Sequence, residues 1–149
     1  MRAVALIPAF NAAGSIEATI QGLRTIPEIG TILVVDDGSS DETARRAAEA
    51  GAEVIRHQRN LGKGAALNTG LAALRNRGFE ALALVDSDLG ASAAEFARLL
   101  APVLEGRAEM TIARFPRARR RGGFGLAKGF CHLGLLAFTG QWFAAPMSG

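Results

Sequence analysis

The stretch Thr31-Ile32-Leu33-Val34-Val35-Asp36-Asp37-Gly38-Ser39 decides the fold of this chain. It opens with an unbroken apolar and β-branched run, which is typical of a strand buried on both faces of a parallel sheet. Two aspartates, a glycine and a serine follow, and they indicate a turn where the strand ends. Ser39 and Glu42 have the spacing of a capping box, so we expect a helix from there to about Ala50. The stretch therefore predicts a buried strand, a tight turn and a helix in succession.

The same order of elements repeats on both sides of this stretch. The other predicted strands are residues 3–7, 53–57, 81–85 and 109–113, and the other predicted helices begin near Ser15, Gly62 and Ser92. Pro8 is expected to end the first strand. Strands that alternate with helices in this way predict an α/β fold with a mostly parallel sheet and helices on both faces.

Composition and charge limit the classes of protein that fit. The lone Cys131 excludes a disulfide framework, and we expect a reduced, cytoplasmic setting. Residues 1–109 carry 11 basic and 14 acidic residues, whereas residues 110–149 carry six basic residues and no acidic one. We therefore expect the C-terminal part to face an anion. The final residues, Ala144–Gly149, have the composition of a loop, so we expect the native protein to continue beyond them.

Polar or turn-forming residues follow three of the first four predicted strands. They are Pro8-Ala9-Phe10-Asn11, Asp36-Asp37-Gly38-Ser39 and Asp86-Ser87-Asp88. Ligands of open parallel sheets bind at the carboxyl ends of the strands, so we expect these residues at one edge of the sheet. A turn and a helix cap explain Asp36–Ser39 equally well when that motif is taken alone. Two acidic clusters at equivalent strand ends favour a binding site, because buried carboxylates need a partner.

The acidic cluster after the fourth strand has the chemistry of a metal site. Asp86 and Asp88 can reach one hard cation together, or one of them can reach a ribose; Mg²⁺ and Mn²⁺ favour such oxygen ligands and complete their shell with water and substrate phosphates. Lys63 precedes a predicted helix, whose N-terminus favours anions. A Walker A loop does not fit, because His57 stands where its first glycine belongs. These features predict a cradle for a metal-bound nucleoside diphosphate.

In their order and spacing, these motifs resemble the family 2 glycosyltransferases, which have a GT-A fold. The matching segments are Ile7–Asn11, Val34–Asp41, Asn60–Ala65 and Leu84–Asp88. The resemblance implies a Rossmann-like GT-A fold and a metal-dependent, inverting transfer of a sugar from a UDP- or GDP-sugar to an acceptor. The implied nucleotide-binding residues are Pro8, Ala9, Phe10, Asp37, Lys63, Asp86 and Ser87, and the implied ligands of Mn²⁺ or Mg²⁺ are Asp86 and Asp88. Within this set, the resemblance implies that Asp37 binds the nucleobase.

Two segments depart from the family pattern. Ala12 and Ala13 follow the first motif where many relatives carry acidic residues. Leu89-Gly90-Ala91-Ser92 stands in place of the His-Pro-Pro of the dolichol-phosphate-mannose-synthase-like members, the subgroup near which the chain would fall.

The chain is predicted to divide into a donor-binding part, residues 1–113, and the start of an acceptor-side region, residues 114–149. The candidates for binding pyrophosphate or a phosphorylated acceptor are Arg114, Arg119, Arg120 and Arg121, and a solvated loop is the alternative of similar weight. Leu126–Phe138 is predicted to be core, with an interfacial helix that touches a membrane as the alternative.

The class of acceptor is inferred from the position of the last carboxylate in the chain. No carboxylate comes after Glu109, so a general base for a hydroxyl acceptor lies beyond this chain, or the acceptor is a phosphate that needs none. We favour a phosphorylated or lipid-phosphate acceptor. Two other functions stay open: a sugar-phosphate nucleotidyltransferase, although the first turn lacks its Gly-rich loop, and a non-catalytic module that binds anions or nucleic acid through the arginines. Because residues 1–109 are net negative, we expect no nucleic-acid partner.

Overall fold

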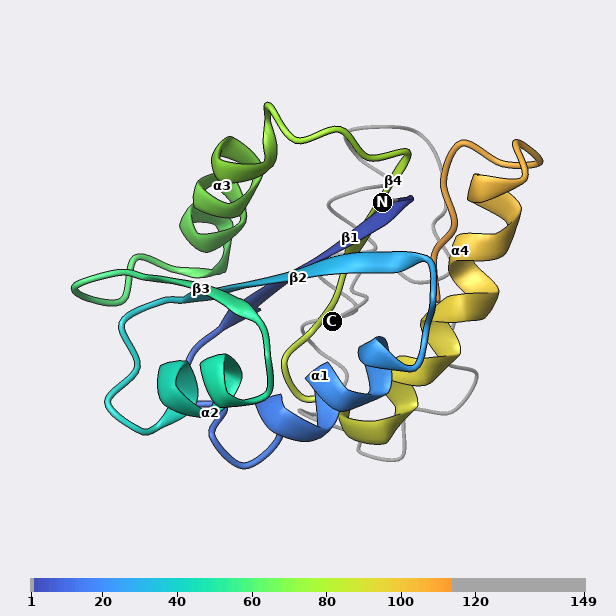
Figure 1. Cartoon of the computed structure of the whole chain (residues 1–149). Helices are drawn as coiled ribbons and strands as arrows, with labels where there is room; N and C mark the ends of the chain where they lie inside the picture. Colours follow the sequence, from blue (N-terminus) through green and yellow to red (C-terminus); the bar gives the residue numbers. More distant parts are fainter. Residues whose placement is uncertain (1, 114–149) are drawn as a thin grey trace, which may run out of the picture. The chain divides into compact units, whose positions relative to one another are not determined.

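The computed structural model describes residues 2–113, which form a four-stranded parallel sheet in the order β3-β2-β1-β4 (Figure 1). The strands are β1 (Ala3–Ala9), β2 (Ile29–Asp36), β3 (Glu53–Arg56) and β4 (Ala81–Leu84). The helices are α1 (Ile16–Arg24), α2 (Thr43–Glu49), α3 (Lys63–Leu74), the 3₁₀ helix η1 (Gly90–Glu95) and α4 (Phe96–Leu104). None of the helices between residues 2 and 113 has the length and hydropathy needed to cross a membrane.

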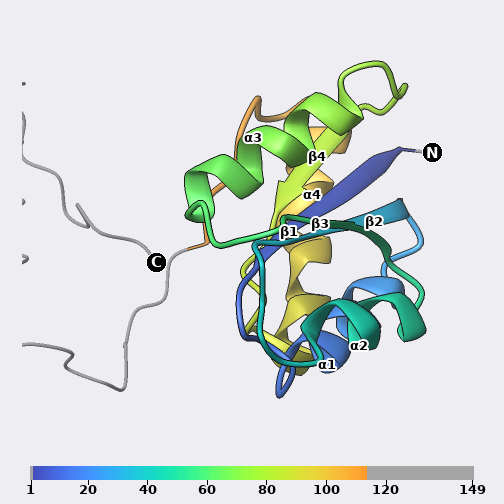
Figure 2. The same ribbon diagram turned by 90° about the vertical axis from the view of Figure 1, so that its left-hand side faces the viewer.

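Helices cover both faces of the sheet, as the sequence predicts. Figure 2 shows α3 on one face and α1, α2 and α4 on the other. Each face has its own apolar cluster, one around Ile7, Ile20 and Val34, and one around Leu6 and Leu33. The expected α/β fold with a parallel sheet is therefore confirmed for the described residues.

The sequence predicts that the first strand ends at Pro8. In the structure β1 continues through Pro8 to Ala9. In a parallel strand the N–H and C=O groups of one residue point to the same side, and the side alternates along the chain. Ala9 faces β2, because its carbonyl accepts from Asp37 N, and Leu6 faces β4, because its carbonyl accepts from Val85 N. Pro8 thus faces the side on which β4 has already ended, so its missing N–H costs no ladder bond.

Residues 109–113 form no strand among the described residues, which corrects the fifth predicted strand. Met110 and Ile112 are 73% and 69% exposed, whereas Thr111 is half-buried and its hydroxyl donates to the Leu99 carbonyl at 2.8 Å. Within residues 2–113 no strand pairs with the backbone of this segment. The adjacent edge strand, β4, is only four residues long. Local apolar pattern alone therefore does not make a strand here.

Two predicted helix starts are also wrong, because the serines in question make other hydrogen bonds. The second helix begins at Thr43, since the Ser39 hydroxyl donates to Asp36 and accepts from the backbone. The Ser92 hydroxyl donates to the Leu89 carbonyl, three residues earlier, within η1, and α4 starts only at Phe96.

Residues 114–149 lie outside the described residues. The predicted division of the chain after residue 113 therefore stays a prediction. The same holds for the phosphate-binding roles of Arg114, Arg119, Arg120 and Arg121 and for the apolar helix at Leu126–Phe138.

Close packing of α3 on β1 depends on Gly70. A Cβ atom added there would lie 2.3 Å from Leu6 Cδ1, and Leu6 is fully buried. Gly64, in the same helix, has open space around it.

We expect Gly70→Ala to lower the free energy of unfolding by about 1–3 kcal/mol, because the added methyl group overpacks the core. Gly64→Ala is the matched control and should leave stability unchanged or raise it by up to about 1 kcal/mol through helix propensity. Urea unfolding of the three proteins measures both effects. Equal stability of the two variants would contradict the packing argument.

Candidate functional site

The polar motifs meet at one edge of the sheet, as the sequence predicts. Ala9 is paired with Asp36 in the ladder between β1 and β2, so the turns after these strands begin side by side. The turn after β4 begins at the same edge, where Val85 N donates to Leu6 O. Pro8 and Ala9 are buried within β1, and Phe10 is 48% exposed at its end.

The turns after β1 and β2 are joined by three consecutive backbone amides. Asn11 N donates to Ser39 Oγ at 2.9 Å, Ala12 N to Thr43 Oγ1 at 2.8 Å, and Ala13 N to Asp41 Oδ2 at 3.1 Å. The two alanines that stand where relatives carry acidic residues thus contribute through their backbone. This ladder of contacts fixes the chain on both sides of Asn11, which has a positive φ of 49°.

The hydrogen bond from the Thr43 hydroxyl lowers the pKa of Asp41; burial opposes it, and the amides of Ala13 and Thr43 reinforce it. Asp36 is fully buried, and its Oδ1 accepts from Ser39. Its Oδ2 accepts no hydrogen bond but lies 3.1 Å from Arg56 Nε, so an ion pair compensates the charge. The carboxylates of Asp36 and Asp41 therefore stabilise the turns in which they lie.

Asp37 is 3% exposed and holds the loop that leads into α3. Its Oδ1 accepts from Leu61 N at 2.9 Å and lies 2.7 Å from His57 Nδ1, and its Oδ2 accepts from Gly62 N at 2.7 Å. Burial raises the pKa of Asp37, but the hydrogen bonds from Leu61, His57 and Gly62 outweigh it, and the net pKa is lowered. About four lone pairs are available on a carboxylate, and three are used here. Binding of a nucleobase by Asp37 stays a prediction.

His57 is not predicted as a site residue, because its only local signal is its place at the end of a predicted strand. Its Nδ1 lies against Asp37, and its Nε2 lies 2.9 Å from Thr69 Oγ1 on α3. The imidazole therefore links the turn after β2 to the helix that begins at Lys63. Such a link across the sheet edge is visible only in three dimensions.

The turn after β4 carries the carboxylates that are left for a ligand. Asp86 Oδ1 lies 2.6 Å from Lys63 Nζ, and both side chains are partly exposed. Asp88 is exposed, and no group within residues 2–113 forms a hydrogen bond or ion pair with its carboxylate. Ser87 lies between them and is half-buried.

This donor set fits a hard divalent cation that is shared with a substrate. The described part of the chain has no cluster of three His, Cys, Asp or Glu side chains that could hold a metal by itself. Mg²⁺ usually binds to one or two carboxylates and takes its other oxygens from water and substrate phosphates. Asp86 and Asp88 supply that number of carboxylates, and Lys63 adds a positive charge beside them for a diphosphate.

Comparisons with known proteins identify the family. Residues 4–130 match the family described as glycosyl transferase family 2. An uncharacterised protein of Methanocaldococcus jannaschii is 31% identical over 131 residues, and glucosyl-3-phosphoglycerate synthase of Mycobacterium tuberculosis is 30% identical over 122 residues. These alignments cover 81% and 75% of this chain, but 54% and 37% of the two relatives. The chain thus spans about half of the first relative and little more than a third of the second.

Solved structures agree with these alignments. The Mycobacterium tuberculosis synthase in complex with Mn²⁺, UDP-glucose and phosphoglyceric acid has a TM-score of 0.61 and is 30% identical, over 70% of this chain and 40% of that one. The complex of this synthase with Mg²⁺ and UDP has a TM-score of 0.60 and is 29% identical, over 69% and 39%. The Rossmann-like GT-A fold that the resemblance implies is therefore confirmed.

Asp37 makes the stability of this edge depend on pH. A carboxylate whose folded pKa is depressed contributes stability that is fully present above its unfolded pKa and is lost as pH falls through the folded value. We expect Asp37→Asn to lower the free energy of unfolding by about 1–3 kcal/mol at pH 7. The difference from wild type should shrink below about pH 4, because the protonated acid then resembles the amide.

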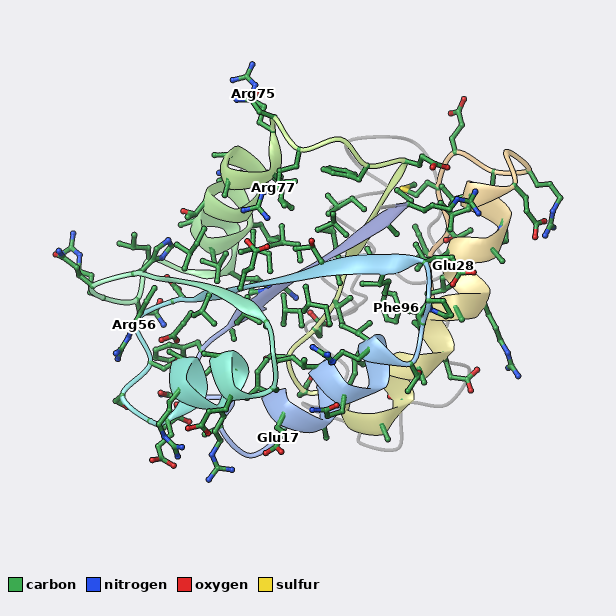
Figure 3. The ribbon with its side chains drawn as sticks, viewed as in Figure 1. Glu17, Glu28, Arg56, Arg75, Arg77 and Phe96 are labelled. Atoms are coloured by element: carbon green, nitrogen blue, oxygen red, sulfur yellow. The ribbon has the colours of Figure 1, made fainter. Side chains whose placement is uncertain are left out.

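Thermal unfolding between neutral and acidic pH measures this difference. Glu17→Gln is the control: Figure 3 shows Glu17 on α1 pointing away from the sheet, and no described group pairs with it. Its curve should run parallel to that of wild type. A gap between wild type and Asp37→Asn that stays constant in acid would contradict the prediction.

Proposed function

This chain belongs to glycosyl transferase family 2, and we propose that it is the donor-binding part of a metal-dependent glycosyltransferase that uses a nucleoside-diphosphate sugar. The observation that carries the proposal is the turn after β4, where Asp88 has no partner among the described residues and Asp86 lies against Lys63. A metal-bound diphosphate is the ligand that would satisfy all three groups. The other carboxylates at this edge, those of Asp36, Asp37 and Asp41, accept hydrogen bonds from backbone amides. They therefore stabilise the turns around the site and are not proposed as metal ligands.

We propose a UDP-sugar as the donor and Mn²⁺ or Mg²⁺ as the cofactor. The support is that the related synthase has been solved with UDP and either ion. Asp86 and Asp88 would hold the metal, which supplies charge neutralisation for the departing diphosphate. Lys63, the first residue of α3, would lie beside the same phosphates, where the helix N-terminus also favours an anion.

We expect UDP with Mn²⁺, at about 100 times its dissociation constant, to raise the melting temperature of the wild-type protein by about 5–10 °C. Asp88→Asn keeps the size of the side chain but removes its charge, so the part of the shift that depends on Mn²⁺ should vanish. Glu17→Gln makes the same charge change on the outer face of α1 and should keep the full shift. Absence of any shift in the wild-type protein with UDP and metal would reject the proposed function.

We further propose that the acceptor carries a phosphate group. The related synthase has been solved with phosphoglyceric acid, and in this chain no carboxylate follows Glu109 while six basic residues do. The resemblance also implies direct displacement, which inverts the anomeric carbon of the sugar. A lipid phosphate is the alternative source of the same charge, and it would bring the protein to a membrane surface.

The enzyme that contains this donor-binding part, given UDP-glucose and Mn²⁺, should transfer glucose to 3-phosphoglycerate or to a polyprenyl phosphate but not to glycerate, which lacks the phosphate. Chromatography of labelled products distinguishes the two phosphorylated acceptors, and the anomeric proton in NMR spectra reports the configuration. Equal transfer to glycerate would contradict the acceptor proposal, and a product with retained configuration would contradict inversion. A cytoplasmic location stays a prediction, which cell fractionation tests.

A further inference from the structure

One face of α1 holds the turn that carries the two candidate metal ligands. Ser15, Thr19 and Gly22 follow each other at intervals of four and three residues, so they lie on the same side of the helix. This side packs on η1, the element that directly follows Asp88 and Leu89. Helix α1 therefore supports the turn that follows β4, in addition to packing on the sheet.

Two hydroxyl groups on this face hold the backbone on both sides of Asp88. The Ser87 carbonyl accepts from Ser15 Oγ at 2.9 Å and from Thr19 Oγ1 at 3.1 Å. On the other side, Gly90 N donates to the same Thr19 Oγ1 at 2.8 Å. Thr19 thus bridges the residue before Asp88 and the second residue after it.

Both hydroxyls hydrogen-bond the turn as well as their own segment of the chain, since Ser15 Oγ also donates to the Ala12 carbonyl at 3.3 Å. Ser15 occupies the N-cap position of α1, yet its side chain makes no capping hydrogen bond. Thr19 is fully buried, and its hydroxyl proton is shared between the carbonyls of Ser87 and Ser15, both 3.1 Å away. A buried hydroxyl is favourable only when it is hydrogen-bonded, and the turn supplies an acceptor for this hydroxyl, the Ser87 carbonyl, and a donor to it, Gly90 N.

Gly22 sets the distance at which the turn can reach these hydroxyls. A Cβ atom at Gly22 would lie 3.2 Å from both Ala93 Cβ and Ala94 N and 3.3 Å from Gly90 O. These contacts are tighter than most real Cβ contacts, so a side chain here would push η1 outward. The close approach of α1 and η1 brings Gly90 N within reach of Thr19.

We propose that Thr19, assisted by Ser15, is a positioning residue for the metal ligand Asp88, an inference that rests on the proposed function. Asp88 itself is exposed and unpaired within residues 2–113, so only its backbone can hold it in place. Fixing the chain on both sides of a ligand reduces the entropy that the ligand loses when it binds the ion. Groups that hydrogen-bond a metal ligand directly are typically worth about 10–100-fold in metal affinity, and we expect an effect of the same order from this hold on the backbone beside Asp88.

The test uses the full chain and measures Mn²⁺ binding without reference to turnover. Thr19→Val removes the hydroxyl but keeps the shape of the side chain. In the presence of saturating UDP, electron paramagnetic resonance of free Mn²⁺ should show a dissociation constant raised by about 10–100-fold. Binding of UDP without metal should be unchanged, and Thr19→Ser should restore Mn²⁺ affinity.

Thr25→Val is the matched control, because Thr25 also lies at α1 and donates its hydroxyl to a carbonyl, that of Gly22, at 2.7 Å. It should bind Mn²⁺ like wild type. Ser15→Ala removes one of the two donors to Ser87, and it should weaken Mn²⁺ binding even if Thr19→Val does not fold.

Three outcomes would overturn the proposal: unchanged Mn²⁺ affinity in both Thr19→Val and Ser15→Ala, equal weakening of metal-free UDP binding, or no rescue by Thr19→Ser. Each of these leaves the proposed function standing, because wild type still binds UDP and Mn²⁺. If wild type binds neither, the proposed function fails and the positioning role fails with it.

Discussion

Burial of β1 along its whole length is the constraint on which the rest of the structure depends. All seven residues of this strand are buried, with β2 on one side and β4 on the other. Because all three strands run in the same direction, their carboxyl ends come to one edge. The turns that hold Asp37 and Asp88 therefore converge at this edge. The hydrogen bonds from Leu61 and Gly62 to Asp37 and the ion pair of Lys63 with Asp86 then join the start of α3 to them. The position of the candidate site thus follows from the packing of an apolar strand in the middle of a parallel sheet.

The carboxylates at this edge divide into two groups by their surroundings. Asp36, Asp37 and Asp41 accept hydrogen bonds from backbone amides and hydroxyls of neighbouring turns. Asp86 and Asp88 sit on a turn that the protein holds through its backbone, so their side chains stay partly exposed. The first group stabilises the edge, and the second leaves charge that an ion can neutralise. Nothing in the chemistry of aspartate itself makes this difference.

Much of the fold could be predicted because it depends on local pattern. The apolar runs at β1 and β2 predict buried strands, and the residues that follow them predict turns. The errors arose where a serine took hydrogen-bond partners other than the start of a helix, or where a predicted strand has no described neighbour to pair with. Ser39 bonds to Asp36 and to the backbone of Asn11 and so does not start a helix, and residues 109–113 have the composition of a strand but no described neighbour to pair with.

The sequence by itself determined the parallel α/β fold, the edge at which its polar motifs meet, and the family. These follow from periodicity and motif order, which are properties of neighbouring residues. Only the tertiary structure decided which aspartates are engaged and which has no partner within residues 2–113. It also revealed His57 and Thr19, whose partners lie twelve or more residues away in the chain. Hydrogen bonds between turns depend on the distance between strands and helices, and that distance is set by packing, as at Gly22 and Gly70.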